Sequence, residues 1–193
     1  NLVGTVIEET KTLPIYPFAI AQLEAEKIVD SPQKEIITTI IRCSNTFGTP
    51  YFENIKCWKL LVNNLCRSAF QNGKLVINSS GQSYRNFIAV DEVVRAIHHL
   101  LELNNEVKFN RIYNLGSTDT VQIIDIARRI QKELKNSFDY DCPIETNKSS
   151  SVNTKVESFI FSTRKKNELG YMPVSNEKEI RKLLVHCKIE DIQ

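Results

Sequence analysis

Apolar residues recur every three or four positions in four stretches of the chain. Such spacing is typical of a helix with one buried side. The four sets are Phe18, Ala21, Ala25 and Ile28; Trp58, Leu61, Val62, Leu65 and Ala69; Ile123, Ala127, Ile130 and Leu134; and Ile180, Leu183, Leu184 and Cys187. We therefore predict four amphipathic helices, each with its stripe facing a core.

Between these helices lie runs that predict β-strands. Residues 35–41 are rich in β-branched side chains and apolar on both faces, as expected of a strand buried in a parallel sheet. Residues 42–50 supply turn residues that should end this strand. Shorter strands are predicted at 74–78, 85–90 and 111–115. The alternation of strands and helices indicates an α/β fold with crossover connections.

Polar residues mark the expected ends of several elements. Asp91 is placed to cap a helix over residues 92–101, and Thr120 is placed to cap the next helix. Residues 136–157 are rich in Ser, Asn, Asp and Lys, which predicts a solvated loop with room for one short strand.

Composition narrows the class of protein. The 193 residues are 41% hydrophobic and 25% charged, with a formal net charge of +2, so no basic face for nucleic acid is expected. No apolar run reaches the roughly 18 to 20 residues that cross a membrane. The five cysteines form no Cys-x-x-Cys pair, which favours reduced thiols over a disulfide framework or a metal site. We therefore expect a soluble, cytoplasmic protein.

One segment carries most of the functional information. Residues 17–26 read Pro-Phe-Ala-Ile-Ala-Gln-Leu-Glu-Ala-Glu. They resemble the Pro-Tyr-Ala-x-Ser-Lys-Leu-x-x-Glu helix of the extended short-chain dehydrogenase/reductases, the family of NAD(P)-dependent nucleotide-sugar epimerases and dehydratases. The family's tyrosine is replaced here by Phe18 and its lysine by Gln22.

Further motifs match the same family in the same order. These are Arg42-x-x-Asn45-x-x-Gly48, the stretch from Gly81 to Ala96, Tyr113-Asn114-Leu115-Gly116, and the terminal Leu-Gly-Tyr-x-Pro at 169–173. The opening residues 3–9 resemble the loop that follows the family's central active-site strand. Residues 151–154 lack the arginine that many relatives have in an Arg-Pro-Gly-Asp segment there, which predicts a weaker grip on substrate or a different sugar.

The resemblance implies an α/β fold that corresponds to the C-terminal part of an extended Rossmann-type dehydrogenase/reductase, including its small α/β substrate-binding region. Residues 1–50 would end the Rossmann-type domain, and 111–135 would return a strand and a helix to it. Residues 51–110 and 136–193 would mainly form the substrate-binding region.

The replaced positions predict a disarmed active site. In the family the phenol exchanges a proton with the sugar, and the ammonium lowers the phenol's pKa and holds the nicotinamide ribose. Phe18 has no proton to give, and Gln22 keeps only a weak, uncharged cofactor contact. We therefore assign no catalytic residue. Phe18 is also compatible with a purely structural place in the apolar stripe of its helix.

Two other positions keep the family's ligand-binding residue types. By resemblance, Asn45 would hydrogen-bond a nucleotide-sugar and Arg85 would bind its diphosphate through two phosphate oxygens. A plain turn residue at position 45 and a solvated arginine at position 85 are the structural alternatives. The ligand would be a UDP-, dTDP-, GDP- or CDP-linked sugar.

The cofactor expectation depends on residues that this sequence does not contain. No Gly-x-x-Gly-x-x-Gly turn occurs in the 193 residues, and that turn brings backbone amides to a dinucleotide pyrophosphate. We therefore expect NAD or NADP only together with a preceding half, and none for this chain alone. We also expect the chain to be the C-terminal part of something longer.

The sequence is compatible with two functions. The first is the nucleotide-sugar-binding part of an epimerase/dehydratase-like protein for surface-polysaccharide sugars, poorly active or inactive as it stands. The second is a non-catalytic pseudoenzyme that acts as a regulatory or scaffold subunit. A homodimer is expected by resemblance only.

Overall fold

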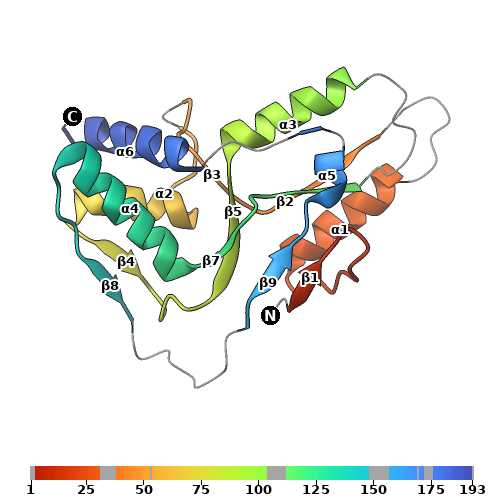
Figure 1. The fold of residues 1–193 in the computed structure, drawn as a ribbon, viewed down its shortest axis with the longest axis horizontal. Coiled ribbons are helices and arrows are strands. Elements are labelled where there is room, and N and C mark those ends of the chain that lie inside the picture. The colour runs from red at the N-terminus through yellow and green to blue at the C-terminus, as the bar shows by residue number, and fades with distance from the viewer. Residues whose placement is uncertain are drawn as a thin grey trace.

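The computed structural model describes residues 3–30, 38–52, 54–103, 112–147, 157–168, 170–171 and 176–192, which form an α/β fold (Figure 1). The strands are β1 (Gly4–Val6), β2 (Ile40–Cys43), β3 (Asn45–Phe47), β4 (Leu75–Ile77), β5 (Tyr84–Ala89), β6 (Ile112–Leu115), β7 (Thr120–Gln122), β8 (Ile144–Thr146) and β9 (Phe159–Phe161). The helices are α1 (Pro17–Asp30), α2 (Leu61–Gln71), α3 (Val90–Glu102), α4 (Ile123–Phe138), α5 (Arg164–Glu168) and α6 (Asn176–Ile192). The predicted fold class is confirmed.

The strands pair over long sequence distances and mostly in parallel. β2 pairs with β6, β3 with β5, β1 with β9 and β4 with β8, all in parallel, whereas β5 pairs with β7 antiparallel. Parallel pairing requires a crossover between the two strands. One such crossover, from β3 to β5, contains α2 and β4.

Strand β5 separates two hydrophobic cores. Phe87 and Ala89 belong to the larger core, under α2, α4 and α6, whereas Ile88 belongs to a smaller core with residues of α3 and β6. Successive side chains of a strand point to opposite faces. β5 is therefore buried on both faces, and its neighbours Arg85 and Asn86 must also point in opposite directions.

Helix α1 lies at the surface of the described part of the chain. None of its residues is buried, and Phe18 and Ile28 are 77% and 69% exposed. The prediction that this stripe packs in a core is therefore wrong for the described residues. A stripe with helical spacing shows which side of a helix is apolar, but a neighbour must be present to cover it.

A polar clamp fixes α1 to the sheet. The guanidinium of Arg42 on β2 donates to both carboxylate oxygens of Glu26 on α1, at 2.6 to 3.2 Å, and to the backbone oxygen of Glu8 at 2.8 Å. The side chain of Glu8 in turn accepts from the amide of Asn114 on β6 at 2.9 Å. Arg42 therefore joins three segments directly and a fourth through Glu8.

Three local predictions are corrected by the structure. Asp91 is not a cap, because α3 already begins at Val90, and Ala89 stands at the cap position. Thr120 lies in β7 and not at the start of α4. Residues 4–6 form a strand where a loop was expected, since a parallel partner, β9, lies beside them.

The chain also stays extended where a turn was predicted. Residues 45–47 form β3 because β5 offers them hydrogen-bonding partners, which no local pattern reveals. The short strand expected within 136–157 is found as β8. Residues 35–37 and 111 of two predicted strands lie outside the described part of the chain.

The clamp gives a first prediction. Arg42→Lys removes the two-pronged contact with Glu26, so the free energy of unfolding should fall by about 1 to 3 kcal/mol, measured by urea denaturation. Glu24→Gln is the control, because its ion pair with Lys27 on the same helix is exposed and should contribute little. Equal losses in the two variants would contradict a special role for Arg42.

Candidate functional site

Asn45 and Arg85 lie on neighbouring strands. Asn45 on β3 pairs with Phe87 on β5, two positions from Arg85. Because paired residues and every second residue of a strand share one face, Asn45 and Arg85 lie on the same face of this sheet. The structure thus brings together two residues that are 40 positions apart in the chain.

Both side chains are exposed and keep part of their hydrogen-bonding capacity. The amide nitrogen of Asn45 donates to the backbone oxygen of Asn86 at 2.9 Å, which leaves the amide oxygen as an acceptor. One nitrogen of Arg85 donates to the backbone oxygen of Tyr84 at 2.7 Å. A guanidinium has five N–H donors, so several remain for an anionic group.

Phe18 and Gln22 lie in the first turns of α1, and both are exposed. An apolar ring at position 18 can exchange no proton, and the amide at position 22 offers one uncharged contact. With no glycine-rich turn in the chain, these residues do not by themselves fit a dinucleotide. We therefore derive no reaction step through NAD or NADP from this chain.

The back of β5 is held by a side-chain amide. Asn86, 2% exposed, donates to the backbone oxygens of Ser117 and Asp119, both at 3.0 Å, and accepts from the amide of Ser117 at 3.0 Å. These bonds fix the loop after β6 behind the strand that carries Arg85. They also satisfy every polar atom of a buried amide, which would otherwise be costly.

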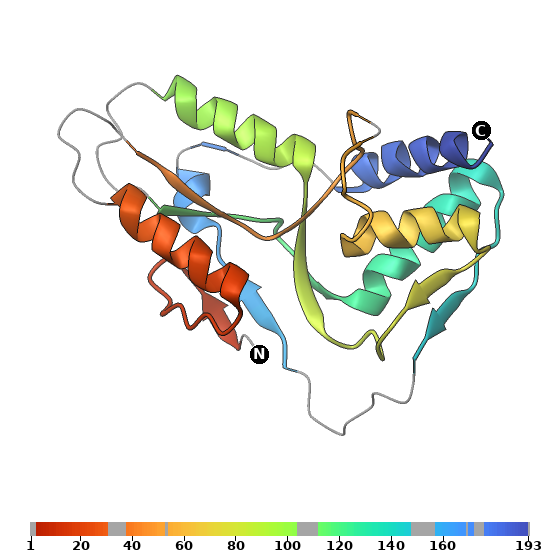
Figure 2. The same ribbon diagram turned by 180° about the vertical axis from the view of Figure 1, so that it is seen from behind.

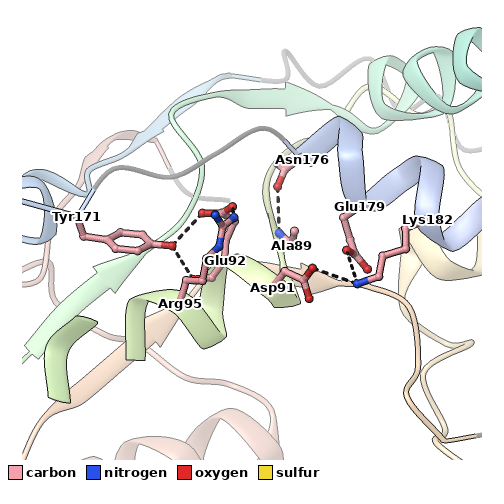
Figure 3. Close-up of polar contacts among 8 residues, drawn as sticks. All are labelled: Ala89, Asp91, Glu92, Arg95, Tyr171, Asn176, Glu179 and Lys182. Atoms are coloured by element: carbon pink, nitrogen blue, oxygen red, sulfur yellow. Dashed lines mark hydrogen bonds and ion pairs between the residues drawn. The ribbon is translucent and has the colours of Figure 1, made fainter. Parts of the chain in front are cut away.

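The first turns of α6 hold the ends of the same strands, and Figure 3 shows the contact between Asn176 and Ala89. Asn176 accepts from the amide of Ala89 at 3.0 Å and donates to the backbone oxygen of Phe87 at 2.9 Å. Glu179 accepts from the amide of Thr49, which follows β3, at 2.8 Å. Residues near the C-terminal end of the sequence therefore help to position both β3 and β5.

A buried carboxylate lies beside this network. Glu92 on α3 is 2% exposed; it accepts from the hydroxyl of Tyr171 at 2.9 Å and forms an ion pair with Arg95 (Figure 3). The same hydroxyl contacts the backbone oxygen of Glu92 at 2.8 Å. Burial raises the pKa of Tyr171, against a smaller opposite effect of Arg95, so the hydroxyl keeps its proton.

A cavity of about 640 Å³ is lined by the loop after β6, by α4 and by the start of α6. Its lining includes Ser117 and Asp119 from the loop that Asn86 holds, one face of α4, and Asn176 at the start of α6. Neither Asn45 nor Arg85 lines it. The cavity is therefore separate from the two residues that the sequence selects.

The described ranges contain neither a cluster of metal-ligating side chains nor a helix that could span a membrane. No group of three or more His, Cys, Asp or Glu side chains is arranged to hold a metal ion there. No helix among these residues has both the length and the apolar character needed to cross a membrane.

Comparison with known proteins decides the family. A family model described as "NAD dependent epimerase/dehydratase family" matches residues 3–116, which is more than half of the chain. The chain belongs to this family. Its resemblance to the extended short-chain dehydrogenase/reductases is thereby confirmed.

Curated relatives include nucleotide-sugar enzymes. The chain is 25% identical over 173 residues to dTDP-D-glucose 4,6-dehydratase of Homo sapiens, covering 89% of this chain and 44% of that protein. It is 28% identical over 122 residues to the protein of the same name in Dictyostelium discoideum, covering 61% of this chain and 26% of that protein. The chain thus spans less than half the length of either relative.

Solved structures agree on the fold. A UDP-glucuronic acid 4-epimerase from Bacillus cereus, in complex with UDP-glucuronic acid and NAD, matches with a TM-score of 0.76 at 19% identity, over 98% of this chain and 58% of that one. A dTDP-glucose 4,6-dehydratase from Bacillus anthracis, in complex with NAD, matches with a TM-score of 0.72 at 19% identity, over 98% and 57%.

Sequence reasoning missed Asn86, Asn176 and Glu179, which hold the strands of the candidate site in place. The sequence contained a signal for Asn86. It is a polar residue directly after Arg85 in a predicted strand, so its side chain must point to the opposite face and needs polar partners there. For Asn176 and Glu179 no local signal exists, since their partners are the backbones of β5 and Thr49, more than 85 residues earlier.

The buried carboxylate gives a second prediction. Tyr171→Phe leaves Glu92 without one of its donors, so the free energy of unfolding should fall by about 1 to 3 kcal/mol in urea denaturation. Tyr84→Phe serves as the control, because the Tyr84 hydroxyl has no hydrogen-bond partner among the described residues. A Tyr171→Phe variant as stable as this control would contradict the assignment.

Proposed function

We propose that the chain is the nucleotide-sugar-binding part of an epimerase/dehydratase-like protein, which has lost ordinary turnover at α1. The observation that carries this proposal is the placement of Asn45 and Arg85 on one face of neighbouring strands, combined with Phe18 and Gln22 at the family's two catalytic positions. The curated relatives named above are dehydratases of dTDP-D-glucose.

Arg85 would bind the diphosphate. Its free donors form a rigid, permanently charged fork that fits two phosphate oxygens, and its exposed position leaves room for a ligand. Asn45 would accept a hydrogen bond from a sugar hydroxyl through its free amide oxygen. Neither interaction depends on the nature of the base, so UDP-, dTDP-, GDP- and CDP-sugars all fit these two contacts.

The chain lacks the family's tyrosine and lysine on α1, where Phe18 and Gln22 stand. Loss of a general acid/base typically costs roughly 10² to 10⁴ in rate, and Gln22 supplies no positive charge to favour a phenolate. We therefore propose that the chain binds a nucleotide-sugar of surface-polysaccharide metabolism and that Phe18 and Gln22 support little or no turnover of it.

A dinucleotide-binding half would complete the protein. β2 has β6 as its only partner strand in the described part of the chain, and the apolar side of α1 is uncovered there. Figure 2 shows β2 between α1 and α3. We propose that residues 1–50 and 111–135 belong to a Rossmann-type domain completed by such a half, which would bring NAD or NADP.

The second candidate is a pseudoenzyme that binds the ligand and regulates or scaffolds a partner. The replacement of both catalytic residue types favours it, and the intact pair of Asn45 and Arg85 is compatible with it. A homodimer through α1 fits the exposed apolar residues of that helix. A cytoplasmic location remains part of this proposal.

Ligand binding is tested at Arg85. In the full-length protein, Arg85→Ala should weaken the binding of UDP-glucose or dTDP-glucose by about 1 to 3 kcal/mol, measured by calorimetry, because charged hydrogen bonds are lost. Arg128→Ala is the control, since Arg128 is an exposed arginine of α4 paired with Asp125. Unchanged affinity in Arg85→Ala would remove Arg85 from the site.

The loss of turnover is tested by restoring the two groups. Phe18→Tyr combined with Gln22→Lys should give the full-length protein measurable turnover of a nucleotide-sugar with NAD or NADP, followed by reduced-nicotinamide absorbance and product analysis. Phe18→Tyr alone should gain less, since no ammonium then lowers the phenol's pKa. High activity in the unmodified protein would refute the disarmed site.

A further inference from the structure

We propose that the cavity lined by α4, the start of α6 and the loop after β6 is a second ligand site, that its ligand is a phosphorylated sugar, and that binding there stiffens β5. The proposal rests on the cavity's own side chains and not on the nucleotide-sugar site, because neither Asn45 nor Arg85 lines the cavity. Its volume of about 640 Å³ lies within the range of roughly 300 to 1,000 Å³ that is usual for small-molecule sites.

One face of α4 supplies the groups for a phosphate. Arg129, Lys132 and Asn136 line the cavity and follow one another at spacings of three and four, which places them on one side of the helix. Lys132 and Asn136 form no hydrogen bond or ion pair within the described residues. Arg129 has only a long contact with Asp119, at 3.9 Å. Two cations and an amide are thus available to an anion.

The remaining polar groups suit sugar hydroxyls. Asp119, Glu133 and Glu177 line the cavity, and carboxylates accept hydrogen bonds from hydroxyl groups. Glu133 is already paired with Arg181 at 2.6 Å, which offsets its charge. Ser117 and Thr118 in the lining add two hydroxyls. A simple anion would meet these carboxylates unfavourably, whereas a ligand that joins one phosphate to several hydroxyls satisfies both sets.

The cavity wall is connected to β5. Ser117 and Asp119 are the partners of Asn86, and Asn176 binds the backbone of Phe87 and Ala89. A ligand that contacts these wall residues adds interactions that exist only while the wall and β5 stay joined. It must therefore stabilise that arrangement, and with it the strand that carries Arg85.

The test measures binding of glucose 1-phosphate to the full-length protein by calorimetry. Saturable binding should weaken about tenfold or more in Lys132→Gln, because a charged hydrogen bond is lost. Lys135→Gln should leave it unchanged; Lys135 is on the same helix but pairs with Asp139 and Asp141 outside the cavity. Binding should be weaker for inorganic phosphate and for glucose alone.

Hydrogen exchange provides the second measurement. Saturation with glucose 1-phosphate should slow exchange of the Ala89 amide, which donates to Asn176, in the parent protein and not in Lys132→Gln at the same concentration. Absence of saturable binding, or equal binding in Lys132→Gln and the parent, would overturn the site. Binding of phosphate as tight as that of glucose 1-phosphate would overturn the sugar, and unchanged Ala89 exchange would overturn the link to β5.

Neither measurement uses a nucleotide-sugar. A failure of Arg85→Ala to change UDP-glucose affinity would therefore refute the proposed function and leave this site standing, and the reverse also holds.

Discussion

The alternation of side chains along β5 is the constraint on which the rest of the structure depends. The strand is paired on both edges, with β3 and β7, and covered by a core on both faces. Phe87 and Ile88 can satisfy two different cores only because they point in opposite directions. The same geometry sends Arg85 to the face of Asn45 and sends Asn86 to the opposite face. A shift of one residue would exchange all four environments.

Polar side chains, and not apolar contact alone, fix this register. Asn86 and Asn176 bind backbone groups from the loop after β6 and from β5 itself, and Glu179 binds the amide that follows β3. Each bond satisfies a group that would be costly to bury alone. The side of β5 that carries Arg85 is therefore set by contacts on the other side of the strand and at its end.

The residues at the family's two sets of positions are held in different ways in this chain. The residue types that would grip a nucleotide-sugar are positioned by strands with many partners, whereas the helix that would carry the proton shuttle is fixed by the Arg42 clamp and buries none of its own residues. Replacement of an exposed side chain on such a helix disturbs little of the fold. Phe18 and Gln22 can therefore stand on α1 without disturbing the strands that carry Asn45 and Arg85.

The sequence by itself determined the family, the α/β class and the apolar faces of α2, α4 and α6, because these depend on local spacing and on motifs that stay close together in the chain. It also selected Asn45 and Arg85. Only the tertiary structure decided that residues 45–47 continue as a strand, that Asp91 is not a cap, and that the stripe of Phe18 and Ile28 is uncovered. The partners that settle these points lie far away along the chain, and spacing carries no information about which distant segment arrives beside a given residue.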